Sequence, residues 1–210
     1  KFCPIGNIMF ALLTAASLAA TAPASPRRRA LLLDIDGTLV RTDGLYFDVF
    51  AKLLAPFGYD VTPDWYEKNV HGGVDAVVFK RLMPDTYTEA DLLDMSKQKD
   101  ALFCAKASER WVDGPSTPTI GGLGAALAMA RAEGYRCIAV TNAPRPAAEL
   151  CLATLRRDLD AGDIIEDLVI GAECSEAKPS AEPYRVAMER LGVAPRDCVV
   201  FEDSRSGVRS

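Results

Sequence analysis

The stretch Ala30–Leu39 contains the feature that most constrains the fold, an apolar run that ends in two aspartates, Asp34 and Asp36. Residues 30–33 are apolar without alternation, which predicts a short strand buried on both faces of a parallel sheet. Gly37 lets the backbone turn sharply directly after the aspartates. Two carboxylates this close repel each other unless a cation or a shared proton lies between them. The stretch therefore predicts a nucleophilic carboxylate on a hard metal ion, beside a carboxyl group that moves a proton.

Three later apolar runs also end in polar or small residues. They are 136–140 before Thr141-Asn142, 168–170 before Gly171, and 198–201 before Glu202-Asp203. Helical patterns over 122–133, 146–159 and 182–191 alternate with these strands. The alternation predicts an α/β fold with a doubly wound parallel sheet, whose ligands bind beyond the carboxyl ends of the strands.

A long segment between the first two predicted strands has helical patterns and no strand signal. Helices are predicted over Tyr46–Phe57, from Thr62-Pro63 onward, over Val74–Leu82, and after Thr88. Because these helices interrupt the alternation, we expect a helical cap over residues 45–113, inserted into a core made of residues 30–44 and 114–210.

Charge and histidine content exclude several classes of function. The net charge of −5, with acidic and basic residues well mixed, gives no electrostatic case for a nucleic-acid partner. The single histidine, His71, removes most histidine-based metal sites, and no GxSxG elbow supplies the serine of a hydrolytic triad. We expect a monomer whose partner is a small metabolite.

The two ends of the chain differ from the rest. An apolar run at 8–20, too short to span a bilayer, precedes small residues and Arg27-Arg28-Arg29, as in a secretory or organellar leader. A disordered extension over residues 1–29 explains the pattern equally well, so a cytoplasmic and an organellar, plastid-like location both stay open. Because the chain ends at Ser210, soon after the fourth strand, we expect a core truncated at its carboxyl end.

Four polar motifs follow the strands in a fixed order. They are Asp34-x-Asp36-Gly37-Thr38, Thr141-Asn142, Lys178-Pro179 and Glu202-Asp203-Ser204. Together with the helical insert, they resemble the motifs and small cap of the haloacid dehalogenase superfamily, from about residue 30 to the end. More narrowly, residues 141–145 and 171–174 resemble plant-type broad-range sugar-phosphate phosphatases and beta-phosphoglucomutase-like phosphatases.

This resemblance implies magnesium-dependent hydrolysis of small phosphomonoesters through an aspartyl-phosphate. Asp34 would attack phosphorus, Asp36 would protonate the leaving alkoxide, and Lys178 would neutralise charge. The implied phosphate- and substrate-binding residues are Gly37, Thr38, Tyr46, His71, Thr141, Asn142, Ala143 and Arg145. The implied Mg²⁺ ligands are Asp34, Asp36 through its carbonyl, Asp203 and, close behind, Glu202.

Departures from the family pattern leave the sugar specificity open. Tyr46 stands where family members often have a histidine, and His71-Gly72-Gly73 has glycine where a basic residue is usual. A phosphomutase, a non-catalytic phosphate-accepting module and an inactive fragment remain alternatives. Dehalogenation is disfavoured, because that reaction needs no acid at the position of Asp36.

Overall fold

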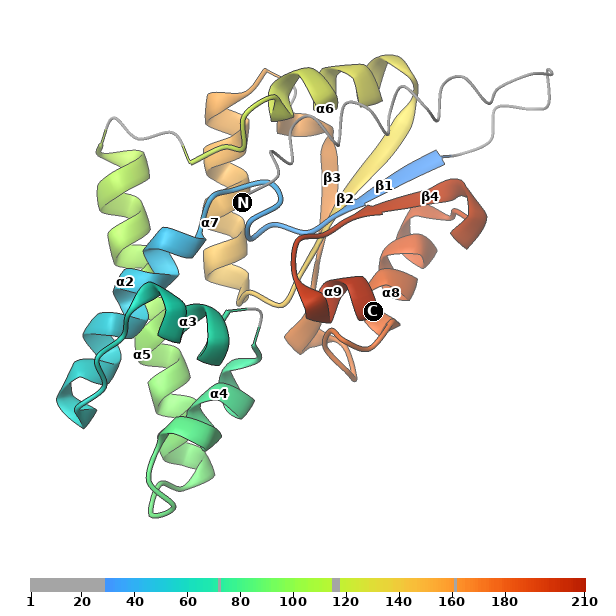
Figure 1. The fold of residues 1–210 in the computed structure, drawn as a ribbon. Helices are drawn as coiled ribbons and strands as arrows, with labels where there is room; N and C mark the ends of the chain where they lie inside the picture. The colour runs from blue at the N-terminus through green and yellow to red at the C-terminus, as the bar shows by residue number, and fades with distance from the viewer. Residues whose placement is uncertain (1–28, 72, 115–117, 161) are drawn as a thin grey trace.

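Four parallel strands form the sheet of the computed structural model, which describes residues 29–71, 73–114, 118–160 and 162–210. The strands are β1 (Arg29–Leu33), β2 (Tyr135–Thr141), β3 (Ile165–Ile170) and β4 (Cys198–Phe201), in the order β3-β2-β1-β4 (Figure 1). Strand β1 therefore has a neighbour on each side, and its carboxyl end lies between those of β2 and β4. The predicted doubly wound α/β fold is confirmed.

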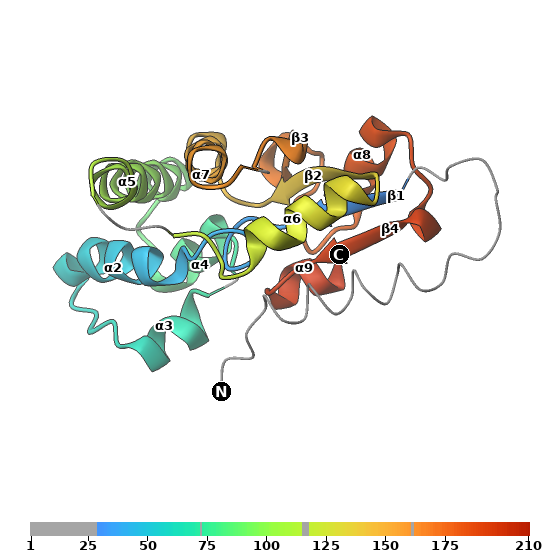
Figure 2. The same cartoon turned by 90° about the horizontal axis from the view of Figure 1, so that it is seen from above.

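Helices cover both faces of the sheet. They are α6 (Leu123–Ala132) and α7 (Arg145–Asp158) on one face, and α8 (Glu182–Leu191) on the other (Figures 1 and 2). Leu31 and Leu33 pack in the cluster of α6 and α7, whereas Leu32 packs with Tyr184 of α8. Residues 30–33 are fully buried, so β1 is covered on both faces of the sheet, as its continuous apolar run predicted.

The cap consists of four helices between β1 and α6, and lies to one side of the sheet in Figure 1. The helices are α2 (Asp43–Leu54), α3 (Pro63–Asn69), α4 (Asp75–Leu82) and α5 (Glu89–Ala107). They enclose a separate apolar cluster that includes Phe50, Tyr66 and Phe79. Helix α5 begins with a capping box between Thr88 and Asp91, which stabilises its amino end. Helix α2 begins at Asp43, three residues before the start of the predicted helix at Tyr46.

Short helical turns join these elements. They are Ala55–Phe57, Gly162–Ile164, Gly171–Glu173 and Pro195–Asp197 as 3₁₀ turns, Ser108–Val112 as a π-helical turn, and α9 (Arg205–Arg209) after β4.

The two segments that connect the cap to the core are paired with each other. The Arg41 amide donates to the Pro118 carbonyl at 2.7 Å, and the Ile120 amide donates to the Leu39 carbonyl at 3.1 Å. Val40 and Thr119 form an antiparallel bridge between these bonds. The cap therefore leaves and rejoins the core at one place.

The predicted leader falls on residues 1–29, of which the structure describes only Arg29, the first residue of β1. In the part of the chain that the structure describes, no helix has both the length and the apolar character needed to cross a membrane.

Candidate active site

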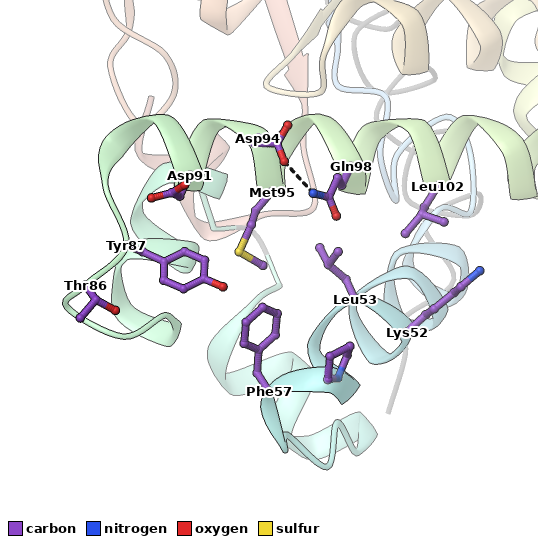
Figure 3. A pocket seen from close by; sticks show the side chains of 11 residues that line it. Lys52, Leu53, Phe57, Thr86, Tyr87, Asp91, Asp94, Met95, Gln98 and Leu102 are labelled. Atoms are coloured by element: carbon purple, nitrogen blue, oxygen red, sulfur yellow. Dashed lines mark hydrogen bonds between the residues drawn. The ribbon is translucent and has the colours of Figure 1, made fainter.

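A cavity of about 360 Å³ lies where the carboxyl ends of the strands face the cap. Its wall combines core residues that include Asp34, Asp36, Thr141 and Lys178 with residues from α2, α4 and α5. The volume lies within the roughly 300–1,000 Å³ of small-molecule sites. A larger hollow of about 670 Å³ lies within the cap between α2 and α5, around Met95 (Figure 3). That hollow contains none of the sheet-end residues, so the smaller cavity is the candidate site.

The Lys178 ammonium group bonds to groups at the carboxyl ends of three strands. Its Nζ donates to Asp34 Oδ1 after β1 at 2.8 Å, to Glu202 Oε1 after β4 at 2.5 Å, and to the Val140 carbonyl of β2 at 2.7 Å. Lys178 is only 2% exposed, so these bonds form away from solvent. Burial raises the pKa of Asp34, and Lys178 opposes that rise. The ammonium group therefore favours the ionised form of Asp34, which is the form that acts as a nucleophile, against the effect of burial.

Both carboxylate oxygens of Glu202 accept hydrogen bonds. Its Oε1 also accepts from the Tyr184 hydroxyl at 2.8 Å, and its Oε2 accepts from the Ser204 amide and hydroxyl at 3.1 and 2.9 Å. Gly207, the third residue of α9, leaves space for this carboxylate, because a Cβ there would lie 1.7 Å from Glu202 Oε1. The position of Lys178 thus depends on a glycine five residues after Glu202.

Gly207→Ala is expected to lower kcat by about 10- to 100-fold, because the displaced Glu202 would lose charge-assisted hydrogen bonds to Lys178. The matched control is Gly44→Ala on α2, where a Cβ would meet nothing within 4 Å. Steady-state kinetics with an aryl phosphate would check both variants. Equal activity of the two variants would contradict the positioning of Lys178 by Glu202.

Asp36 lies beside Thr141, whose hydroxyl is 3.3 Å from Asp36 Oδ2. Among the described residues, Asp36 Oδ1 and the hydroxyl oxygens of Thr38 and Thr42 are buried without a hydrogen-bond partner. Burial raises the pKa of Asp36. A carboxyl group with a raised pKa holds a proton more readily, which is the property of a general acid.

Asn142 supports Lys178 through the backbone. Its Nδ2 donates to the Lys178 carbonyl at 3.0 Å, and its Oδ1 accepts from the Lys178 amide at 3.1 Å. A Cβ on Gly171 would lie 2.3 Å from Asn142 Oδ1, so the glycine after β3 makes room for this contact. The neighbouring Ala143 amide donates to Thr141 Oγ1 at 2.9 Å. The Asn142 side chain therefore holds Lys178 in place, a function that we did not predict from the sequence.

Three carboxylates at the strand ends fit a hard divalent cation. One oxygen each of Asp34, Glu202 and Asp203 lies within 4.8 Å of the others. Burial, with the charges of Asp43 and Glu202, raises the pKa of Asp203 to about 6, and a bound cation would offset both effects. A Cβ on Gly37, where φ is 73°, would lie 1.8 Å from Asp203 Oδ2, so this glycine lets Asp203 approach. An all-oxygen donor set suits Mg²⁺.

Two cap residues and one residue of α7 in the core, Arg145, were predicted to bind substrate, and only the cap residues line the cavity. Tyr46 lines the cavity and stacks on Phe103, with ring centroids 4.3 Å apart. His71 also lines it, with Nε2 3.4 Å from Asp43 Oδ1. Arg145 is not among the lining residues.

Arg145 instead pairs with Glu173 and Glu149 at 2.6 and 3.1 Å. Of the other predicted residues, Gly37, Thr38 and Glu202 also lie outside the lining set, whereas Ala143 and Asp203 belong to it. The wall of the cavity therefore contains most of the predicted core residues, namely Asp34, Asp36, Thr141, Asn142, Ala143, Lys178 and Asp203.

Lys99 was missed by sequence reasoning. It lies on α5, is 4% exposed, and lines the cavity with Asp75 and Asp100. In the sequence it lies in the polar run 96–100, but it is four residues from both Met95 and Phe103, so helical spacing puts it on their face of α5, unlike Lys97. That spacing was the signal that could have identified it.

The chain is similar to known proteins over most of its length. A family model described as haloacid dehalogenase-like hydrolase matches residues 28–210. The protein CbbY of Rhodobacter capsulatus is 29% identical over 195 residues, covering 87% of this chain and 80% of that protein. A phosphorylated carbohydrates phosphatase of Thermotoga maritima is 29% identical over 181 residues, covering 86% and 79%. The crystal structure of CbbY from Rhodobacter sphaeroides in complex with phosphate has a TM-score of 0.67 at 27% identity, covering 87% and 80%.

Proposed function

The chain belongs to the haloacid dehalogenase-like hydrolase family, and on that basis we propose that it is a magnesium-dependent phosphatase of small phosphorylated carbohydrates. The family resemblance predicted from the four motifs is confirmed, and with it the assignment as a phosphoric monoester hydrolase. The relative that is a phosphorylated carbohydrates phosphatase supports the substrate class. The mechanism and the metal are part of the proposal.

The observation that carries the proposal is the contact of Lys178 Nζ with Asp34 Oδ1, 2.8 Å apart at the end of β1. Asp34 attacks phosphorus and takes up the phosphoryl group as an aspartyl-phosphate, while the alcohol leaves. Lys178 holds the attacking carboxylate in place and offsets the negative charge on the transferring group. Thr141 and the backbone after β2 lie beside it in the same wall, where phosphate oxygens would bind.

In this proposal Asp36 carries out the two proton transfers. It gives a proton to the leaving alkoxide, and then takes one from the water that hydrolyses the aspartyl-phosphate. Its buried Oδ1 has no partner among the described residues, so a substrate oxygen or a water would complete its hydrogen bonding. The Thr141 hydroxyl, 3.3 Å from Oδ2, orients the carboxyl group.

Asp34 and Asp203 would hold Mg²⁺, with Glu202 behind them because both of its oxygens already accept hydrogen bonds. When bound, the ion supplies positive charge next to the transferring phosphoryl group and the acidic cluster. Gly37 gives Asp203 the space to reach that position.

Removal of divalent metal tests this assignment. With Mg²⁺, the protein is expected to hydrolyse p-nitrophenyl phosphate and hexose phosphates, and EDTA is expected to lower the rate by about 10³-fold, since the ion contributes several kcal/mol to the transition state. Added Mg²⁺ should restore the rate. Phosphate release is the measurement, with circular dichroism to show that the fold survives EDTA. A protein that releases phosphate equally well in EDTA would rule out the metal, and one that hydrolyses no phosphomonoester would rule out the function.

A further inference from the structure

Carboxylates outnumber basic groups among the charged residues that the cap contributes to the described wall of the cavity. Asp43, Asp75 and Asp100 line it from α2, α4 and α5. The basic cap residues in the described wall are Lys99 and His71, and none of the lining residues is an arginine. The side of the cavity that faces the leaving group is therefore acidic.

The charge of Lys99 is neutralised by its neighbours. Its Nζ donates to Asp75 Oδ2 at 2.5 Å and lies 2.9 Å from Asp100 Oδ1. Because Lys99 is 4% exposed, both carboxylates act on it at low dielectric. The three side chains together carry a net negative charge, so Lys99 does not make this wall attractive to an anion.

The other cations in the described wall are also paired. His71 Nε2 lies 3.4 Å from Asp43, and His71 Nδ1 lies 3.7 Å from Glu67. Lys178 is held by Asp34 and Glu202, at the place where the phosphoryl group binds. No lysine or histidine in the described wall is thus left to bind a second anionic group on the substrate.

Given the proposed phosphatase activity, on which this inference rests, we propose that the cap selects phosphomonoesters whose alcohol is neutral or carries an amine, and rejects those with a carboxylate or a second phosphate. Hydroxyl and ammonium groups donate hydrogen bonds to carboxylates such as Asp75 and Asp100. An anionic group would lose its hydration to face like charges. Asp75 and Asp100 are then specificity-determining residues.

Three hexopyranose 1-phosphates that share one ring test the effect of charge on the leaving group. They are glucosamine 1-phosphate, glucose 1-phosphate and glucuronic acid 1-phosphate, whose leaving groups are cationic, neutral and anionic at pH 7. The expected kcat/KM decreases in that order, with the anionic sugar at least about tenfold below the neutral one. Hydrolysis of p-nitrophenyl phosphate with Mg²⁺ in the same preparation shows whether the enzyme is active.

Variants on one helix test the residues. Asp100→Asn removes one of the two carboxylates next to Lys99, and is expected to raise the ratio of glucuronic acid 1-phosphate to glucose 1-phosphate turnover by about five- to tenfold. Asp94→Asn is the matched control, because Asp94 lies on α5 at the larger hollow, where it accepts from Gln98 at 2.7 Å (Figure 3). The control should leave the ratio unchanged.

A ratio measured on one preparation does not depend on how much protein is folded, and Asp75→Asn provides the same test if Asp100→Asn is poorly produced. Equal or faster turnover of the anionic sugar by the wild type, or an unchanged ratio in Asp100→Asn, would overturn the inference and leave the phosphatase assignment intact. Turnover of p-nitrophenyl phosphate but of none of the three sugars would also overturn it. Absence of all hydrolysis would overturn the proposed function itself.

Discussion

Replacing Asp34 by asparagine is expected to reduce kcat for every phosphomonoester by at least about 10⁴-fold, as removal of a catalytic nucleophile does. The substituted amide would keep the shape of the side chain but could not form the acyl phosphate. The fold should persist, because burial raises the pKa of Asp34 and its ionised form therefore costs stability in the folded state. Lys178 would retain its bonds to Glu202 and to the Val140 carbonyl.

Phosphate release and thermal unfolding would be measured on Asp34→Asn and on Asp94→Asn, a substitution of the same kind in the cap. We expect a melting temperature within a few degrees of the wild type in both cases, and a loss of activity only in Asp34→Asn. If Asp34→Asn and Asp34→Ala both kept wild-type activity, Asp34 could not be the nucleophile.

Replacing Asp36 by asparagine is expected to slow the hydrolysis of alkyl phosphates by about 10²- to 10⁴-fold, because the alkoxide would leave without a proton. An aryl phosphate such as p-nitrophenyl phosphate should lose much less in its first step, since p-nitrophenolate leaves unprotonated. The contact of Asp36 with Thr141 can be kept by the asparagine oxygen, so the local structure should change little.

The measurement is the ratio of kcat/KM for glucose 1-phosphate to that for p-nitrophenyl phosphate, in the wild type and in Asp36→Asn. Because each ratio comes from a single preparation, partial unfolding does not alter it. A ratio that stays the same in the variant would mean that Asp36 does not protonate the leaving group.

Most of the fold could be predicted because its strands and helices carry strong local signals. The continuous apolar run of β1 is buried on both faces, and the later strands alternate with helices because the sheet is parallel. Thr88 caps the amino end of α5. Helix α8 has the predicted bounds, Glu182–Leu191, since proline lies in its first turn and Gly192 follows it with a positive φ. Boundaries without such signals were less accurate, as at Asp43.

The candidate site was predictable only where residues follow strand ends. Asp34, Glu202 and Asp203 meet because parallel strands end at one edge of a sheet. The burial of Lys99 follows from its place between Met95 and Phe103 on the buried face of α5, but a lysine on that face has no partner in the local sequence, because Asp75 comes from α4. Arg145 is the opposite case, a residue that we predicted in the site from its position in a motif. Its side chain instead pairs with Glu149 and Glu173 and does not line the cavity.

The bridge between Val40 and Thr119 has a consequence for the evolution of such enzymes. Because it brings the two segments that flank the insertion side by side, a tight turn between Arg41 and Pro118 would close the core without moving β1 or α6. Helices α2–α5 can therefore be lengthened, exchanged or lost as one unit, while Asp34, Lys178 and Asp203 keep their places. A lineage can change the compounds it accepts by remodelling one continuous stretch of its gene, and leave the reaction itself untouched.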